Sequence, residues 1–348
     1  MLKGEYEKQL ATVALFPYRK DVWRKDAVPA QKMIVELVNA IAKYQDVVLG
    51  ILPGTKDEIL RHYGFLPRVK LFEVMYDDCW ARDMLASICE DEHGDKRVNA
   101  LGFNAYGGEL YASWENDAAL NENLIGAVFG YDVKHYPVTM EWGNLTPDGN
   151  GTVFVVEDSV VNANRNPGMT KEEIERVLLE CTGARQLIWL PFGLPGDETG
   201  GHIDNVLAFA DRHTMLLSYT DDRSNPHYEA THTIYDLLSK VKDADGEPYD
   251  IVKLPVPKYH KRTASDSDGI LDADGSFDRE AGDDVLYTYV NYTQVNGAVI
   301  LPSFGIEEDK EAYDVIKKVY PGRDIIAMDA SEAFLGGGGF HCLTKHIN

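Results

Sequence analysis

The spacing of apolar residues along the chain predicts four amphipathic helices. In residues 29–44, apolar side chains recur at intervals of three and four positions, and Pro29 stands where the first turn of a helix accepts proline. Residues 170–181 begin with Thr170, which lies three positions before Glu173. This spacing is typical of a capping box at the start of a helix. Residues 226–241 and 308–319 have the same helical period.

A short run of β-forming residues follows each predicted helix, over residues 47–52, 186–190, 251–256 and 325–328. Longer β-rich stretches with Gly, Asn or Asp punctuation lie between them, over residues 152–162, 202–219 and 285–302. The order helix, strand, turn and strand pair therefore recurs, with a fifth and less clear copy around residues 116–138. Repetition of one supersecondary unit predicts a radial or stacked α/β arrangement in place of a doubly wound sheet.

The charge balance narrows the classes of partner. The chain has 348 residues, and its 57 acidic and 34 basic residues give a net charge of −23. With 44% hydrophobic residues it has the composition of a globular chain. A nucleic acid needs a clustered basic surface, so the acidity argues against one, and it favours a cationic partner or substrate.

Neither a membrane segment nor a metal-binding cysteine motif is apparent. The apolar runs are far shorter than the ~20 residues that a membrane helix needs, and acidic residues stand where a signal peptide is basic. We therefore expect a cytoplasmic protein without membrane partners. The cysteines at positions 79, 89, 181 and 342 form no Cys-x-x-Cys pair, so free thiols are expected, one of which could be a nucleophile.

The strongest local signal is a run of four glycines, residues 336–339, directly before Phe340-His341-Cys342-Leu343-Thr344. Four glycines cost backbone entropy and pack no side chains, so the run indicates a backbone that closely approaches another group. The residues after it have the character of an ordered strand. Cys342 is therefore a candidate functional thiol.

A second polar stretch, residues 197–205, contains His202 and Asp204. If His202 opens a strand, alternation places both side chains on one face. They could then form a proton shuttle beside a charge clamp, or ligate a metal with Asp197 or Glu198 as the third ligand. Both interpretations stay open at this point.

Two tryptophans lie beside acidic residues. Trp80 stands between Asp78 and Asp83, and Trp142 follows Glu141. An aromatic face and coplanar carboxylates suit a delocalised cation. The acidic stretch 266–284 lacks acids at the first and twelfth positions of a calcium loop, so we interpret it as a solvated loop or lid.

Taken together, these stretches resemble the agmatine deiminase family of guanidine-modifying enzymes, from about Phe16 to Thr344. The resemblance rests on the shared order of several motifs. They are Pro17-x-Arg19-x-Asp21-x-Trp23-Arg24, Trp80-Ala81-Arg82-Asp83, Phe103-Asn104-Ala105-Tyr106-Gly107-Gly108, Asn164-Arg165-Asn166-Pro167, Asp197-Glu198-Thr199, His202-Ile203-Asp204-Asn205, Tyr289-Val290-Asn291-Tyr292, Pro321-Gly322-Arg323, and Gly336-Gly337-Gly338 with His341-Cys342-Leu343-Thr344.

The resemblance implies a five-bladed α/β propeller, the pentein fold, in one catalytic domain over residues 1–348. It implies hydrolysis of agmatine to N-carbamoylputrescine and ammonia through a covalent thiouronium, without cofactor or metal, because the small guanidine substrate carries its own charge. A homo-oligomer is left open. The roles it implies are Cys342 as nucleophile, His202 as acid/base, Glu141 as its assistant, Asp83 and Asp204 as the guanidinium clamp, Trp80 as cover of the substrate face, and Asn291, Gly337 and Gly338 as further substrate contacts.

The sequence departs from the family pattern at several positions that shape the pocket. Met84-Leu85-Ala86 stands for the usual residues after Trp-x-Arg-Asp, and Trp142 replaces a glycine beside Glu141. Gly339 replaces an asparagine, and Lys345-His346 replaces a closing Gln-Gln. The Arg-Met-Pro-x-Glu segment expected before the first strand is missing.

Three alternatives therefore stay open. The first is a deiminase, dihydrolase or amidinotransferase that acts on arginine or another small guanidine. The second is a metal hydrolase built on His202, Asp204 and Glu198. The third is a non-catalytic guanidine- or polyamine-binding protein.

Overall fold

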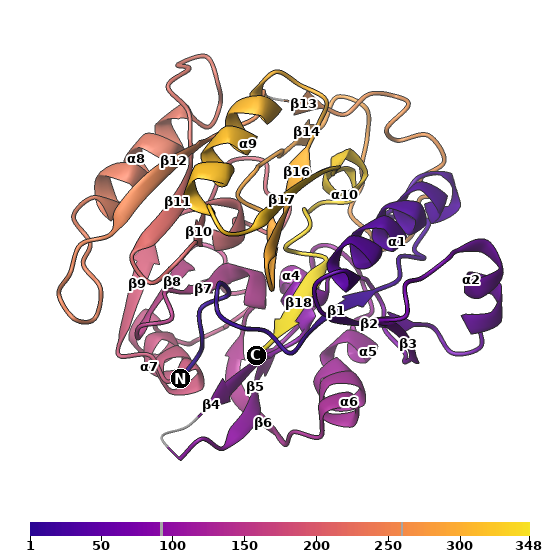
Figure 1. Cartoon of the computed structure of the whole chain (residues 1–348), viewed down its shortest axis with the longest axis horizontal. Helices are drawn as coiled ribbons and strands as arrows, with labels where there is room; N and C mark the ends of the chain where they lie inside the picture. Colours follow the sequence, from indigo (N-terminus) through magenta and orange to yellow (C-terminus); the bar gives the residue numbers. More distant parts are fainter. Residues whose placement is uncertain (91–92, 259) are drawn as a thin grey trace.

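The computed structural model describes residues 1–90, 93–258 and 260–348. Within these residues, five principal sheets surround a common centre, and the longer helices lie around the outside (Figure 1). The strand orders are β18-β1-β2-β3, β4-β5-β6, β7-β8-β9, β10-β11-β12 and β15-β16-β17. The predicted five-bladed α/β propeller is confirmed.

The strand bounds, blade by blade, are as follows. The first blade contains β1 (Ala11–Leu15), β2 (Asp46–Ile51), β3 (Val69–Glu73) and β18 (Thr344–Ile347), and the second β4 (Ser87–Glu90), β5 (Lys96–Gly102) and β6 (Val133–Thr139). The third contains β7 (Leu145–Pro147), β8 (Thr152–Val156) and β9 (Gln186–Leu190), and the fourth β10 (Leu207–Phe209), β11 (Thr214–Tyr219) and β12 (Asp250–Pro255). The fifth contains β15 (Thr293–Val295), β16 (Ala298–Ser303) and β17 (Asp324–Asp329), while β13 (His260–Lys261) and β14 (Asp284–Val285) form a separate pair.

Every blade repeats one connection. Its first strand pairs antiparallel with the second, and the second pairs parallel with the third, as β8 does with β7 and β9. A parallel pair requires a crossover between its strands, and α7 (Lys171–Thr182) provides it here. The recurring order seen in the sequence is therefore one blade, repeated.

The four predicted helices are confirmed as α1 (Val28–Ala42), α7, α8 (Tyr228–Leu238) and α9 (Glu308–Val319). The predicted capping box is present, since Thr170 Oγ1 accepts from the Glu173 amide and Glu173 accepts from the Thr170 amide. The less clear fifth copy contains only short helices between β5 and β6: α4 (Ala105–Gly108), α5 (Glu115–Ala118), η2 (Asn121–Gly126) and α6 (Ala127–Phe129). The other short elements are η1 (Lys25–Ala27), α2 (Lys56–His62), α3 (Ala81–Met84), η3 (Trp142–Asn144), η4 (Ile203–Asn205) and α10 (Ser331–Leu335).

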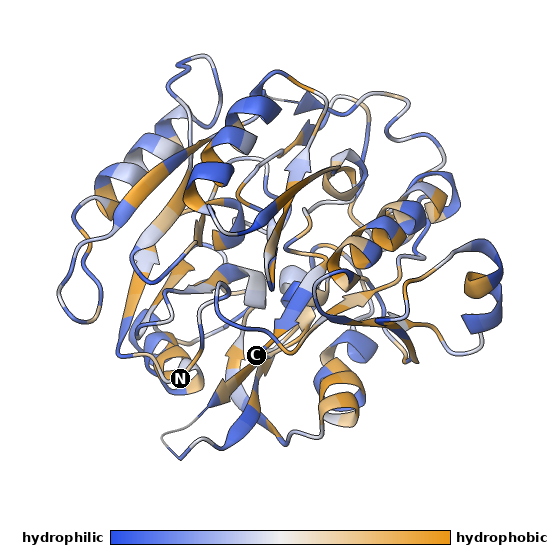
Figure 2. Ribbon diagram, in the orientation of Figure 1, coloured by the Kyte–Doolittle hydropathy of each residue, from blue (hydrophilic) through white to orange (hydrophobic). Residues whose placement is uncertain are grey.

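The hydrophobic core lies between the sheets and the inner faces of the outer helices. All five residues of β1 and of β8 are buried, as expected for strands covered on both faces. The outer helices have apolar and polar faces, which Figure 2 shows for α1 and α8. The helical period of the apolar residues thus gives each of these helices one apolar face, and that face packs against its blade.

The first blade contains both terminal strands. β18 pairs antiparallel with β1, from Ala11 opposite Ile347 to Ala14 opposite Thr344. This pairing closes the ring of blades with the last strand of the chain. It also fixes the turn that precedes β18, which carries Cys342.

Two predicted strand starts are wrong. Residues 203–205 form the 3₁₀ turn η4, and β10 begins only at Leu207; residues 340–343 form a turn before β18. Short-range bonds such as Val206 N–H to Ile203 C=O and Thr344 N–H to His341 C=O hold these turns. Both segments are buried, and burial alone does not distinguish a turn from a strand.

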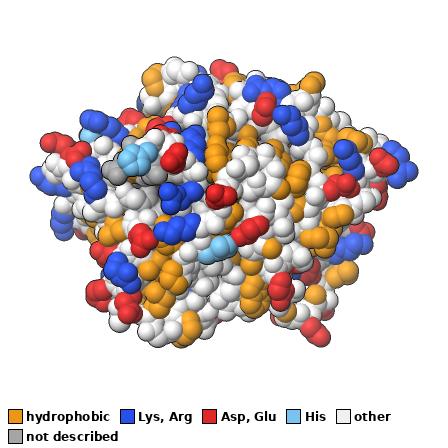
Figure 3. Space-filling model, turned by 90° about the horizontal axis from the view of Figure 1, so that it is seen from below, with side chains coloured by type: hydrophobic (Ala, Val, Ile, Leu, Met, Phe, Trp, Pro, Cys, Tyr) orange, Lys and Arg blue, Asp and Glu red, His pale blue; other side chains and the backbone are white. Residues whose placement is uncertain are grey.

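Charged groups are mixed on the molecular surface. Figure 3 shows one face on which lysines and arginines are interspersed with acidic side chains. In the described parts of the chain, no helix has the length and apolar character needed to cross a bilayer. The four cysteines are free and buried.

Candidate active site

Five segments that are far apart in the sequence bring the predicted site residues together. Each lies just before the first strand of a blade: Asp83 before β4, Glu141 before β7, Asp204 before β10, Asn291 before β15 and Cys342 before β18. Because these strands are related by the repeat of the fold, their entry points converge at the centre. The arrangement explains why the motifs are scattered along the chain.

Cys342 lies beside a carboxylate and an amide. Its Sγ is 3.4 Å from Oδ2 of Asp204 and 3.1 Å from Nδ2 of Asn291. The Cys342 backbone N–H also donates to Oδ1 of Asn291 at 3.3 Å. Asn291 therefore fixes the turn that carries the thiol.

His202 lies between two carboxylates. Its Nε2 is 3.3 Å from Oε2 of Glu141, and its Nδ1 is 3.6 Å from Oδ1 of Asp83. Arg165 Nε donates to both oxygens of Glu141, at 2.9 and 3.0 Å. The buried arginine thus compensates the charge of Glu141 and orients it toward the imidazole.

Asp197 anchors the turn that presents His202. Its Oδ2 accepts from the His202 backbone N–H at 2.9 Å and from Asn205 Nδ2 at 2.8 Å. Its Oδ1 accepts from the Thr199 backbone N–H at 3.0 Å. Asp197 is therefore engaged by the protein's own backbone and side chains.

Gly143 packs directly against the two acidic groups and the histidine. Its amide donates to Oδ1 of Asp83 at 3.0 Å. A β-carbon at this position would overlap Asp83 Oδ1, would be 2.9 Å from His202 Nδ1 and would be 3.2 Å from Asp204 Oδ2. Of the two positions after Glu141, this one has to be glycine.

Trp142, which departs from the family pattern beside Glu141, contacts Lys345, which departs from that pattern as well. The Lys345 ammonium lies 4.7 Å from the centroid of a ring of Trp142, and both residues are buried. A cation over an aromatic face is a favourable contact. The large ring and the lysine thus accommodate one another.

At each of the four glycines, residues 336–339, the backbone passes so close to a neighbouring group that a side chain would not fit. A β-carbon at Gly336 would overlap the Trp23 ring, and one at Gly338 would be 3.0 Å from Cys342 Sγ. At Gly339 it would be 2.5 Å from Asn291 Oδ1. Gly337 has a φ of +115° and faces Glu198, so both its conformation and its surroundings favour glycine.

Trp80 lies next to this backbone. A β-carbon at Gly338 would be 2.9 Å from the Trp80 ring, whose centroid is 5.6 Å from that of Trp23. Trp80 is 5% exposed. The two tilted rings and the glycines form one wall beside Cys342.

Burial and charge set unusual protonation states. Burial raises the pKa of Asp83 to about 6, with the charge of Asp204 adding to the effect of burial. Burial acts to lower the pKa of His202, but Asp83 and Glu141 outweigh it and raise that pKa to about 9. Burial, Asp204 and Asp83 together raise the pKa of Cys342 well above its ordinary value. At neutral pH the free site therefore holds Cys342 as a thiol and His202 as an imidazolium.

Two buried polar atoms of the site have no hydrogen-bond partner among the described residues: Oδ1 of Asp204 and Nδ1 of His202. An unsatisfied buried carboxylate oxygen is costly, and it points to a donor that arrives from outside. Asp83 and Asp204 place two carboxylates near the thiol. This environment suits a planar cation with several N–H donors.

Glu198 does not join His202 and Asp204. It accepts from Arg279 at 2.5 Å and lies 4.0 Å from Arg262. No cluster of three or more His, Cys, Asp or Glu side chains suited to a metal was found in the part of the chain that the structure describes. The three residues of the metal-hydrolase hypothesis are therefore divided between two clusters.

Arg279 belongs to the acidic stretch 266–284, and it also donates to the Gly336 carbonyl at 3.1 Å. Ser276 donates to Asp21 at 2.7 Å, and the Leu271 amide donates to the Lys20 carbonyl at 2.9 Å. The stretch is thus attached to the protein beside the glycine run and along the segment before α1.

Several residues that position the site were not predicted from the sequence. Tyr106 donates from its hydroxyl to Oδ2 of Asp83 at 2.8 Å. Arg165 and Asp197 hold Glu141 and His202 as described, and His341 donates to Asp204 at 2.8 Å. All four lie inside motifs quoted above, but the motifs do not say which groups meet.

The family comparison covers the whole fold. The family model for Porphyromonas-type peptidyl-arginine deiminases matches residues 1–347. The chain belongs to this family. A Listeria monocytogenes protein provisionally named agmatine deiminase 2 is 36% identical over 99% of this chain and 94% of its own length.

Two further comparisons with this chain agree with the family assignment. The Pseudomonas putida protein named agmatine deiminase is 33% identical over 99% of this chain and 94% of its own length. The solved structure of the Enterococcus faecalis agmatine deiminase superposes with a TM-score of 0.94 at 29% identity. That superposition covers 99% of this chain and 95% of the other. Fold and family are thus established by sequence and structure together.

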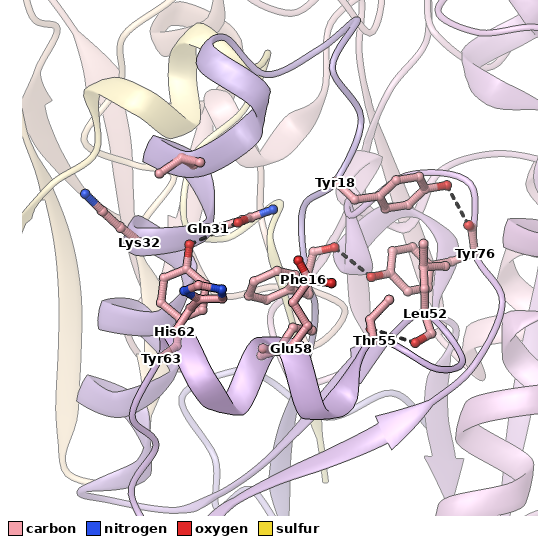
Figure 4. Close-up of a pocket in the computed structure, with 12 residues that line it drawn as sticks. Phe16, Tyr18, Gln31, Lys32, Leu52, Thr55, Glu58, His62, Tyr63 and Tyr76 are labelled. Carbon is pink, nitrogen blue, oxygen red and sulfur yellow. Dashed lines mark hydrogen bonds between the residues drawn. The ribbon is translucent and has the colours of Figure 1, made fainter.

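A separate cavity of about 430 Å³ lies away from these residues, between α1, α2 and the end of β1 (Figure 4). Aromatic and aliphatic side chains line much of it, among them Phe16, Tyr63 and Tyr76. The hydroxyls of Tyr63 and Tyr76 are bonded to Gln31 and to the Phe16 carbonyl. These two hydroxyls are satisfied within the protein, whereas Oδ1 of Asp204 has no partner among the described residues.

Proposed function

We propose that the protein hydrolyses the guanidinium group of agmatine to N-carbamoylputrescine and ammonia. The observation that carries the proposal is the position of Cys342 Sγ, 3.4 Å from an Asp204 carboxylate whose other oxygen lacks a partner among the described residues. Relatives over 99% of the chain that are named agmatine deiminase support the choice of substrate.

Two carboxylates account for recognition of the guanidinium. Asp83 and Asp204 each accept N–H bonds in the plane of the cation, which fixes its central carbon without covering its faces. Trp80 beside Gly338 then covers one face of the substrate, and Cys342 attacks the carbon. Asn291, Gly337 and Gly338 shape the remaining contacts around the thiol.

The first half of the reaction transfers the amidine to sulfur. The Cys342 thiolate forms a C–S bond to the guanidinium carbon, and the carbon becomes tetrahedral. His202, which is an imidazolium at neutral pH, gives a proton to one –NH₂ group, and the C–N bond breaks to release ammonia. A thiouronium remains on Cys342.

The second half consumes water. Neutral His202 takes a proton from a water molecule as its oxygen bonds to the same carbon. The C–S bond then breaks, the electron pair returns to the Cys342 sulfur, and the proton left on the new hydroxyl group passes to that sulfur and restores the thiol. The urea product leaves, and His202 is protonated again for the next cycle. Glu141, held by Arg165, stabilises the imidazolium form of His202.

Substrate charge accounts for activation of the thiol. In the free site the charges of Asp204 and Asp83 help raise the pKa of Cys342. A guanidinium bound between these carboxylates neutralises them and places a positive charge beside the sulfur, which favours the thiolate and releases the thiol proton to water. Activation is therefore coupled to binding of a cation.

The test is incubation with agmatine, arginine and other guanidino compounds, followed by assay of ammonia and ureido product. We expect turnover with agmatine and its loss in Cys342→Ala, with agmatine binding still measurable by calorimetry. Turnover of arginine alone, or amidine transfer to an added amine, would favour another guanidine-modifying enzyme. Binding of agmatine without product in the unsubstituted protein would favour a binding protein.

A further inference from the structure

Glu5 lies beside the candidate site although it precedes the first strand of the propeller. Its Oε1 accepts from Arg82 Nη1 at 2.7 Å, and its Oε2 accepts from His341 Nε2 at 2.9 Å. The side chain is 12% exposed. The segment around it is fixed by backbone contacts with distant blades, such as the Leu2 amide with the Thr182 carbonyl.

His341 connects Glu5 with Asp204. Its Nδ1 lies 2.8 Å from Oδ2 of Asp204, the oxygen that is 3.4 Å from Cys342 Sγ. Both ring nitrogens of His341 therefore face carboxylates. A carboxylate only accepts hydrogen bonds, so both nitrogens have to donate, and the ring has to carry its positive charge.

We propose that Glu5 and His341 are positioning residues for the reaction: Glu5 keeps His341 protonated, and His341 holds Asp204 ionised with Oδ1 left open for the guanidinium. The inference rests on the proposed function, because that function gives Asp204 its role in binding the cation. Neither residue touches the substrate in this scheme. Their contribution passes through the orientation and charge of Asp204.

The charges around Glu5 explain why its carboxylate is needed. Arg82 from α3, and His346 and Lys345 from β18, surround it, with Tyr292 nearby and Asp204 on the far side of His341. Burial and Arg82 act to lower the pKa of His341, but Glu5 and Asp204 outweigh them. Without the Glu5 charge, Arg82 repels the imidazolium and the ring loses its proton.

Loss of that proton changes the titration of the two site carboxylates. Burial raises the pKa of Asp204, but the His341 bond outweighs burial and lowers it, while Asp83 has a pKa of about 6. The two acids repel each other and titrate as a pair, so removal of the cation beside one raises the upper pKa of the pair. The pH below which activity falls, which is the acidic limb of the pH profile, then moves to a higher value.

The test compares Glu5→Gln with the unsubstituted enzyme over pH 5–9, using agmatine. We expect the acidic limb of kcat/KM to move up by about one unit, with a loss of about fivefold at pH 6 and recovery near pH 8.5. Glu5→Asp should restore part of the lost activity. Glu7→Gln, a matched change two residues away, should leave the profile unchanged. An equal loss at every pH would indicate structural damage and would overturn the proposal.

A second variant changes His341, the other member of the chain of hydrogen bonds from Glu5 through His341 to Asp204, which we call the relay. His341→Gln should reproduce the shift of the acidic limb, and the Glu5→Gln/His341→Gln double variant should shift it no further, because both changes interrupt one chain of bonds. Additive shifts would contradict the relay. This comparison also applies if Glu5→Gln alone does not fold.

A readout without substrate separates this inference from the proposed function. In protein labelled with ¹⁵N-histidine, the imidazolium signal of His341 should persist to higher pH in the unsubstituted chain than in Glu5→Gln. Tyr106→Phe, which changes Asp83 and leaves Glu5 in place, should not alter this signal. A shifted His341 titration without agmatine turnover would support the relay and refute the function; turnover with an unshifted titration would do the reverse.

Discussion

The thiol of Cys342 lies 3.4 Å from Oδ2 of Asp204, and the charges of Asp204 and Asp83 add to burial in raising its pKa. A carboxylate at this distance opposes formation of a thiolate. The same carboxylate is the proposed partner of the guanidinium. Asp204 therefore disfavours the Cys342 thiolate in the free protein, and under the proposed function a bound guanidinium removes this effect.

Asp204→Asn should separate these two effects. Removal of the charge lowers the pKa of Cys342, and a fall of about one unit gives about tenfold more thiolate at neutral pH. Alkylation of Cys342 by iodoacetamide, followed by mass spectrometry, should therefore accelerate severalfold without substrate. Turnover of agmatine should fall more than about 100-fold, because the clamp is lost. Slower alkylation in the variant would contradict this view of the site.

The pH dependence of kcat/KM should be bell-shaped. Asp83, whose pKa burial raises to about 6, has to be ionised to bind the guanidinium, so activity falls as the pH falls through 6. His202, with a pKa of about 9, has to be protonated to release ammonia, so activity falls as the pH rises through 9. The Tyr106 hydroxyl bond lowers the pKa of Asp83, and Tyr106→Phe should move the acidic limb upward while the basic limb stays in place. A Tyr106→Phe profile that shifts at both limbs, or not at all, would refute these assignments.

Gly143→Ala should abolish activity through a single added methyl group. Its β-carbon would overlap Asp83 Oδ1 and crowd His202, so the clamp and the acid/base group have to move. We expect a loss of more than about 100-fold in kcat/KM and a destabilisation of about 1–3 kcal/mol. Gly64→Ala is the control, because a β-carbon there has no heavy atom within 4 Å. Normal turnover in Gly143→Ala would show that the two carboxylates need not hold their positions.

Lys345→Met should stabilise the protein in a pH-dependent way. Burial, with a contribution from Arg82, lowers the pKa of Lys345 well below its ordinary value. The unfolded chain binds this proton below about pH 10.4 and the folded chain releases it more readily, so the lysine costs folding free energy that grows as the pH falls. Urea unfolding should show a gain of about 1–3 kcal/mol at pH 7 that shrinks toward pH 10.

Lys318→Met, at an exposed position on α9, is the matched control and should show no such pH dependence. A Lys345→Met variant less stable than the parent at both pH values would mean that the contact with Trp142 outweighs the cost of burial.

The blade pattern and the set of candidate site residues could be read from the sequence because each is marked by a local pattern; the roles of those residues stay predictions. Helix period and capping place α7 and its box at Thr170, and the motifs place Cys342, His202 and the acids in order along the chain. The strands expected at His202 and Phe340 were wrong because both segments are buried turns, and local sequence does not separate a buried turn from a buried strand. Self-association and the single domain stay predictions.

The supporting contacts could not be predicted because they join blades. Tyr106 and Arg165 lie in quoted motifs, yet nothing local shows that they bond Asp83 and Glu141. Trp142 and Lys345 looked like two separate departures until the structure placed one over the other. From the sequence, Glu5 could be described only as an acidic residue near the start of the chain, because its partners Arg82 and His341 lie 77 and 336 positions away.

The most direct measurement is the mass of the protein after a brief reaction with agmatine and an acid quench. The account predicts an added mass equal to agmatine less one ammonia, located by peptide mapping on Cys342 and absent in Cys342→Ala. Turnover that proceeds while Cys342 never carries such an adduct, or that persists in Cys342→Ala, would contradict the account.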